Sequence, residues 1–184
     1  MRKATMLSIR PKWVEKIANG EKPIEVRKTR PKLAPPFKAY IYCTMPDAKD
    51  PHNILELHGA DGKIRKANGK VIGEFTCKGF IPFSHGRPCF VTGAPEEIER
   101  MACLSREEIW EYAPHGNPIG WRITDLVIYN TPRELTEFRM PCPNDLYCEA
   151  CAMYSNNGGI CNNGALPLRR PPQSWCYVEA MKDE

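Results

Sequence analysis

The sequence predicts a mainly β fold of the α+β class, a small barrel with a few helices packed outside it. Five or six short segments have the β-branched and aromatic content of strands, and turn-forming residues separate them. Helical spacing is confined to three short segments, which favours peripheral helices over a helical core. At 184 residues, the chain is long enough for one core with an appendage.

The first elements form a strand–helix–strand unit. Residues 7–10 have the pattern of a short strand, and Pro11 then opens a helix at its first-turn position. Gly20 is the expected stop of that helix, because glycine adopts the left-handed conformation that ends helices. A second strand is predicted for residues 24–27.

This second strand carries charge on one face. Side chains alternate in a strand, so Ile24 and Val26 point one way while Glu25 and Arg27 point the other, with Lys22 leading in from the turn. We expect the apolar pair to face the core. The charged pair then lies either on a solvated surface or in a ligand site, and the residues alone fit both interpretations.

The remaining elements follow from the same patterns. The sequence predicts strands at residues 38–44, 71–77, 121–129 and 174–180, and two short helices within 95–112, the second begun by a capping box at Ser105 and Glu108. Residues 55–69 contain the turn signal Asp61-Gly62 within a basic segment. That segment fits either a solvated hairpin or an arm that faces nucleic acid.

Composition excludes some classes of protein and permits others. The 26 basic and 22 acidic side chains leave a formal charge of +4, which permits a polyanionic partner without requiring one. No apolar run approaches the roughly 20 residues of a membrane span, and Arg10, Pro11 and Lys12 interrupt any signal-peptide core. We therefore expect a cytoplasmic protein with no membrane partner.

Residues 20–27, GEKPIEVR, resemble the G-x-K-x-x-E-x-R signature of ASCH domains, a branch of the PUA-like superfamily. Residues 112–123 are similar to the family's late segment, in which an aromatic residue and a glycine-containing loop precede a strand. Residues 171–178, PPQSWCYV, resemble a closing strand of phage-borne members, which suggests a phage or prophage setting. The resemblance implies a PUA-like barrel formed by residues 1–140 and 172–184.

The resemblance also implies a ligand-binding cleft for RNA or for a modified nucleoside or nucleotide. Lys22, Glu25 and Arg27 would line it, and Ser8 and Arg10, which precede the helix, are within reach of it. Lys22 and Arg27 would hold a phosphate or a base edge, and Glu25 would accept from an exocyclic amine.

An enzyme using the same cleft is the alternative function. Some family members resemble amidohydrolases that remove an acyl group from cytidine, and others resemble ribonucleases; Lys22 and Glu25 would be the catalytic residues here. Those amidohydrolases place a threonine nucleophile where this chain has Glu25, which counts against a covalent mechanism. A lysine of lowered pKa or an activated water could still serve.

Nine cysteines divide into a scattered set and a C-terminal cluster. Cys142, Cys148, Cys151 and Cys161 have the spacing C-x5-C-x2-C-x9-C within residues 141–171, a Cys-rich insertion otherwise made of turn formers. Because such a segment cannot bury a core, four thiolates around a structural zinc ion would supply its folding energy. Disulfides, free thiols and a redox role are the alternatives.

Cys176 could replace Cys142 or Cys161 as a zinc ligand, although its place in a predicted strand favours a packed thiol. An adaptor that binds other proteins through the zinc module is a third functional hypothesis. A zinc deaminase is excluded, because no histidine is followed two residues later by glutamate.

Overall fold

The predicted mainly β architecture with peripheral helices is confirmed in the computed structural model, which describes residues 3–46, 53–59, 61–89, 94–141 and 167–181. In chain order the elements are β1 (Lys3–Ile9), α1 (Pro11–Ala18), β2 (Ile24–Arg27), β3 (Phe37–Cys43), β4 (Glu56–His58), β5 (Ile64–Lys66), β6 (Val71–Ser84), β7 (Arg87–Pro88), α2 (Pro95–Ala102), α3 (Arg106–Tyr112), β8 (Ile119–Arg133), the 3-10 helix η1 (Leu135–Glu137) and β9 (Trp175–Glu179).

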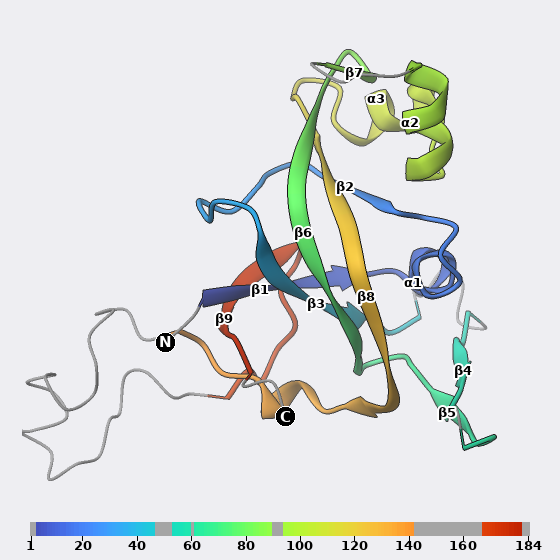
Figure 1. The fold of residues 1–184 in the computed structure, drawn as a ribbon, viewed down its shortest axis with the longest axis vertical. Coiled ribbons are helices and arrows are strands. Elements are labelled where there is room, and N and C mark those ends of the chain that lie inside the picture. Colours follow the sequence, from blue (N-terminus) through green and yellow to red (C-terminus); the bar gives the residue numbers. More distant parts are fainter. Residues whose placement is uncertain (1–2, 47–52, 60, 90–93, 142–166, 182–184) are drawn as a thin grey trace, which may run out of the picture.

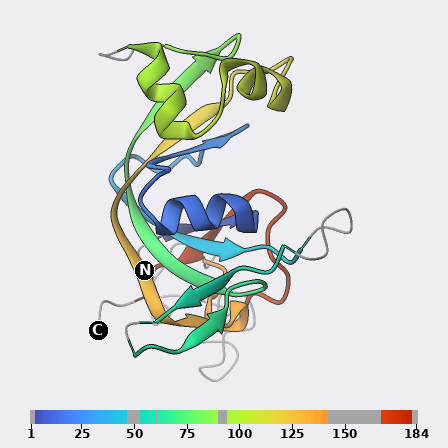
Figure 2. The same ribbon diagram turned by 90° about the vertical axis from the view of Figure 1, so that its right-hand side faces the viewer.

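One sheet organises these elements. Its strand order is β2-β8-β6-β3-β1-β9, with β7 paired to β6, while β4 and β5 form a separate hairpin (Figure 1). β1 runs parallel to β3, and the other neighbours are antiparallel. β6 and β8 are longer than the sequence predicts, and they arch along the molecule with α1 on their concave side (Figure 2).

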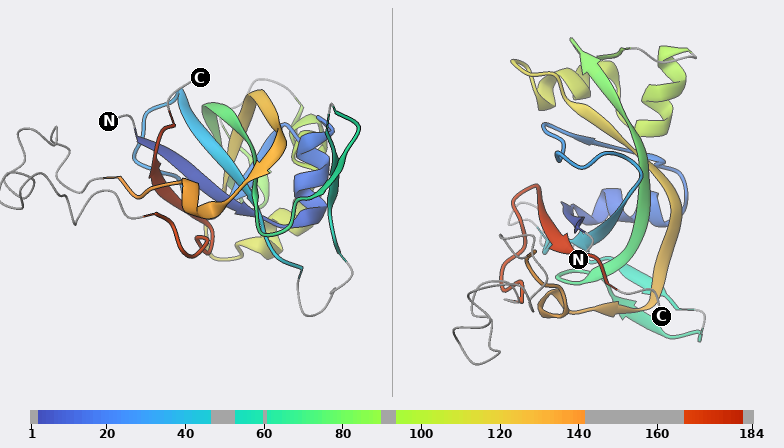
Figure 3. Two further views of the ribbon diagram at one scale, coloured as in Figure 1. Left: turned by 90° about the horizontal axis from the view of Figure 1, so that it is seen from below. Right: turned by 60° about the vertical axis from the view of Figure 1, so that its left-hand side comes forward.

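The sheet curls until its two edge strands approach each other. Within the described residues no backbone ladder joins β2 to β9. Instead, the segment after β2 reaches β9 through side chains: Trp175 Nε1 donates to Thr29 Oγ1 at 2.9 Å, and the Lys32 amide donates to Tyr177 Oη at 2.8 Å. β9 itself lies beside β1, so both ends of the described chain meet at this edge (Figure 3).

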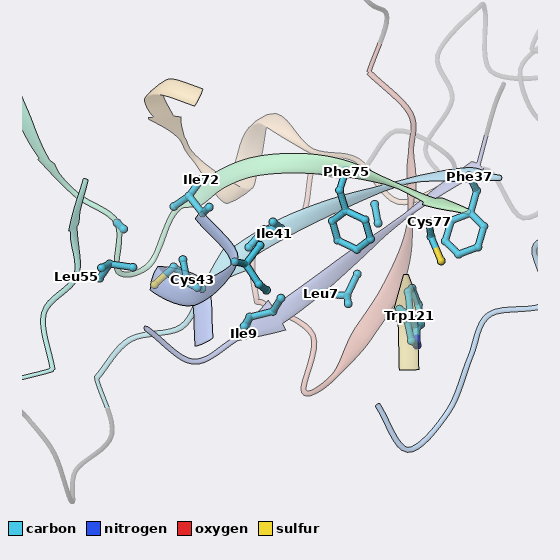
Figure 4. Close-up of a cluster of buried hydrophobic side chains, with 14 residues drawn as sticks. Leu7, Ile9, Phe37, Ile41, Cys43, Leu55, Ile72, Phe75, Cys77 and Trp121 are labelled. Atoms are coloured by element: carbon cyan, nitrogen blue, oxygen red, sulfur yellow. The ribbon is translucent and has the colours of Figure 1, made fainter. Parts of the chain in front are cut away.

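The main core fills the concave side of the sheet. Its members are buried apolar side chains from β1, β3, β6, β8 and α1, among them Leu7, Ile41, Phe75, Cys77 and Trp121 (Figure 4). α1 contributes because Val14 and Ile17 lie one turn apart on the same face.

A second buried cluster covers the other side of β2. Ile24 and Val26 pack there against Ile98 and Ala102 of α2 and Ile109 of α3. The alternation expected for β2 is therefore observed, but all four of its residues are buried. The apolar pair faces the helices, and the charged pair faces the concave side that holds the main core.

Local signals account for the helix ends. Gly20 has φ +76° just after α1, which is the left-handed conformation expected of a helix stop. Ser105 and Glu108 form the predicted capping box at the start of α3. No described helix has the length and apolar character needed to cross a membrane.

Candidate functional site

Three charged side chains of the signature segment meet on the concave face of the sheet. Glu25 lies between two cations: Arg27 Nη2 is 3.1 Å from Glu25 Oε1, and Lys22 Nζ is 3.7 Å from Glu25 Oε2. Lys22, Glu25 and Arg27 are only 2%, 5% and 6% exposed. Burial strengthens these electrostatic interactions, because little water screens them. We call these three residues the charged cluster.

Arg27 connects the two edges of the sheet. Its Nη2 donates to the carbonyl of Ser8 at 2.7 Å, and its Nη1 donates to the carbonyl of Ser174, just before β9, at 3.3 Å. Ser8 Oγ in turn donates to the carbonyl of Pro172 at 2.6 Å. The guanidinium therefore bridges β2 to β1 and to the entry of β9, where the backbone ladder is absent.

Lys22 is held by groups from three elements. Its Nζ donates to the carbonyl of Ala102 at the end of α2, and it lies 4.8 Å from the centre of the Trp13 ring of α1. Burial lowers the pKa of Lys22, and the neighbouring Glu25 opposes that shift. A lysine of lowered pKa is more often neutral near physiological pH than an exposed one, and only the neutral amine can act as a base.

Arg10 and Tyr112 form the exposed side of this region. Burial raises the pKa of Tyr112. The positive charges of Arg27 and Arg10 oppose this shift, and the negative charge of Glu25 reinforces it. Lys28 Nζ lies 5.2 Å from the centre of the Tyr112 ring. The structure thus brings Ser8, Lys22, Glu25 and Arg27 into one group, while Arg10 is at the surface beside it.

Trp121 also belongs to this group, although it is not among the site residues that the sequence predicts. It lies directly opposite Glu25 in the ladder between β2 and β8, so its side chain is on the same face. It is fully buried, and within the described residues its Nε1 has no hydrogen-bond partner. Only the pairing of β2 with β8 reveals this neighbour, because the two strands are far apart in the sequence.

The predicted zinc ligands Cys142, Cys148, Cys151 and Cys161 lie outside the described residues. Cys176 is described: it lies in β9, and burial raises its pKa to about 11, which disfavours the thiolate that a metal needs. In the described part of the chain, no group of three His, Cys, Asp or Glu side chains is arranged to hold a metal ion.

An open pocket of about 540 Å³ lies elsewhere, along the last part of β8. Residues 127–133 and Glu137 line it, so none of the predicted site residues takes part. β2 pairs with the opposite end of β8, at residues 119–122. We therefore place the candidate site at the charged cluster, where perturbed and buried polar groups converge.

Comparison with known proteins identifies the fold. No family model and no curated protein sequence matches the chain. Among solved structures, ASCH from Zymomonas mobilis is similar, with a TM-score of 0.54 and 15% identity over 96% of this chain and 87% of that one. Its serine-to-alanine variant is similar with a TM-score of 0.56 and 16% identity, over 97% of this chain and 89% of that one. Its tyrosine-to-phenylalanine variant has a TM-score of 0.53 and 16% identity, over 97% of this chain and 91% of that one. The chain therefore has an α+β fold similar to that of these ASCH structures.

Proposed function

We propose that this protein is a member of the ASCH family that binds RNA or a nucleotide-like ligand at the charged cluster. One observation carries the proposal: the lysine, glutamate and arginine of the G-x-K-x-x-E-x-R segment converge in a fold that is similar to an ASCH protein. A buried ion pair adds little net stability, and buried charged groups with perturbed pKa values are candidates for functional sites.

Exposed cations beside the cluster suit a phosphate backbone. Arg10 and Lys12 lie at the start of α1, and Lys28 and Arg30 lie in the segment that follows β2. Lys28 and Arg30 also lie over the rings of Tyr112 and Phe80. Cations interleaved with aromatic rings are typical of surfaces that bind single-stranded nucleic acid.

Fluorescence anisotropy with a labelled short RNA tests this proposal. Arg10→Ala should weaken binding. It should also reduce the slope of log K against log[salt] by the amount expected for one phosphate contact, because one phosphate is no longer neutralised. Arg87→Ala is the matched control, since it removes an exposed arginine from β7, a strand that pairs with β6 and contributes no residue to the charged cluster. Equal losses in both variants would indicate non-specific attraction and contradict a site at the charged cluster.

A hydrolase acting at the same place is the second candidate, and the lowered pKa of Lys22 favours it. Ribonuclease or amidohydrolase activity would use Lys22 as a base. Incubation with RNA and with N-acylated cytidine, followed by mass spectrometry of the products, separates turnover from binding. Lys22→Met should abolish turnover if this candidate is right, while product formation by neither protein leaves binding as the function.

We also propose that Cys142, Cys148, Cys151 and Cys161 bind one structural zinc ion. Native mass spectrometry should show one zinc per chain in the purified protein, and Cys148→Ser should lose it. The control is Cys103→Ser, which changes a half-buried cysteine outside the C-terminal cysteine cluster and should keep the zinc. A metal-free wild-type chain would contradict the zinc module and the adaptor hypothesis built on it.

The phage or prophage setting also stays a prediction.

A further inference from the structure

Two hydrogen-bond donors beside Glu25 are buried without acceptors. Within the described residues, Trp121 Nε1 and Arg27 Nε are both buried and neither has a partner. The two residues are 0% and 6% exposed. A buried donor without an acceptor is costly to a fold, and native structures contain few of them. At this point on the concave face, two buried donors therefore lack acceptor atoms among the described residues.

Glu25 has the complementary capacity. Its Oε1 forms an ion pair with Arg27 Nη2 at 3.1 Å, but Lys22 Nζ is 3.7 Å from its Oε2, which is too long for a good hydrogen bond. Trp121 is the cross-strand neighbour of Glu25, a position in which Cβ atoms lie about 4.5–5.5 Å apart. The side chains of Trp121 and Glu25 thus leave from neighbouring positions on the same face of the sheet.

The donor is held in a fixed direction. The Trp121 ring packs edge-on against Phe37, with centroids 5.8 Å apart, and against Phe80, with centroids 5.5 Å apart. In the close-up, the nitrogen of the indole lies at the end turned away from Phe37 and Cys77 (Figure 4). Such packing leaves the indole little freedom, so the direction of its N–H is set before any ligand arrives.

This donor–acceptor pair discriminates between parts of a nucleotide. A phosphate offers only acceptors, so it has no hydrogen to donate to Glu25. The edge of a nucleobase presents a donor beside an acceptor, which matches Glu25 and Trp121. We propose that the charged cluster receives a base edge, with Trp121 Nε1 as donor and Glu25 as acceptor, while exposed cations such as Arg10 and Lys28 hold phosphates.

The proposal rests on the proposed nucleotide-binding function and adds which part of the ligand enters. Because Trp121 and Glu25 are buried, neighbouring side chains must move to admit the base. Tyr112 is the candidate: it is 38% exposed, and the nearby charges of Arg27 and Glu25 influence its pKa.

The test compares two tryptophan-to-phenylalanine variants. Trp121→Phe removes the donor that has no acceptor, so affinity for nucleosides should fall about tenfold. The smaller ring also leaves a cavity in the core, so the unfolding midpoint is expected to fall, and binding is measured where the variant is still folded. Trp175→Phe is the matched control: it removes a donor that is already bonded to Thr29, so the unfolding midpoint should fall. Unchanged nucleoside affinity in folded Trp121→Phe, or an equal loss of affinity in Trp175→Phe, would overturn the proposal and indicate a structural role or a buried water.

Two-dimensional ¹H–¹⁵N spectra of the indole groups give a second readout. The Trp121 signal, assigned by its loss in Trp121→Phe, should shift when cytidine, uridine, adenosine or guanosine is added singly and binds, and it should not shift with ribose 5-phosphate. A shift with ribose 5-phosphate alone would overturn the base-edge proposal and leave the proposed function intact. If neither nucleosides nor RNA bind the wild-type protein, the proposed function fails and this inference fails with it.

Discussion

Glu25→Gln is expected to lower the free energy of unfolding by about 3–5 kcal/mol, because it leaves two buried cations without their counter-charge. Among the residues that the structure describes, Glu25 is the single carboxylate that contacts both Lys22 and Arg27, and all three side chains are almost inaccessible to water. Glutamine has nearly the same shape, so the loss reports charge and not packing. Urea unfolding followed by circular dichroism measures it as a lower midpoint at an unchanged slope.

Two controls make this result specific. Glu21→Gln breaks the exposed ion pair with Lys16 and should leave the midpoint unchanged, because solvent screens that pair. The double variant Lys22→Met with Glu25→Gln removes one charge of each sign, so it should lose less stability than the two single changes combined. Additive losses, or a stable Glu25→Gln variant, would show that the three residues are not coupled.

Gly73→Ala is expected to destabilise the protein by about 3 kcal/mol, since β6 and β8 leave no room for a side chain there. A Cβ at Gly73 would lie 2.3 Å from the carbonyl oxygen of Val127, which is a backbone atom that cannot rotate away. The ladder is irregular beside this residue, between Val71 and Gly73. The two strands would have to separate, which should appear as a lower unfolding midpoint in the same urea experiment.

Gly79→Ala provides the comparison on the same strand. A Cβ at Gly79 would meet only the side chain of Arg122, at 3.7 Å, which is an ordinary contact. Its stability should therefore match the wild type or exceed it slightly, because alanine restricts the unfolded chain. If both variants were equally stable, the close approach of β6 and β8 at Gly73 would not constrain the fold.

Local patterns were sufficient to predict most elements. Alternation along residues 24–27 separates Ile24 and Val26 from Glu25 and Arg27, as the structure also shows. The helix start at Pro11, the stop at Gly20 and the cap at Ser105 each depend on backbone chemistry within a few residues. Such signals are present in the sequence itself, so no knowledge of distant contacts is needed.

Partners across the sheet could not be predicted in this way. Alternation assigns Glu25 to a face but does not say that Trp121 lies opposite it or that Ala102 accepts from Lys22. Nor does it show that both faces of β2 are buried, because α2 and α3 cover one side only through long-range packing. The composition of the site therefore depends on strand order, which short motifs do not encode.

The bridge from Arg27 to Ser174 also sets an order of events during synthesis. The two residues are 147 positions apart, so at roughly 5–20 residues per second the ribosome needs about 7 to 30 s to travel between them. Throughout that interval the nascent chain already carries Lys22, Glu25 and Arg27, but β9 does not yet exist to complete their surroundings. Competence at this site is thus acquired late in translation, after almost all of the rest of the sheet has been made.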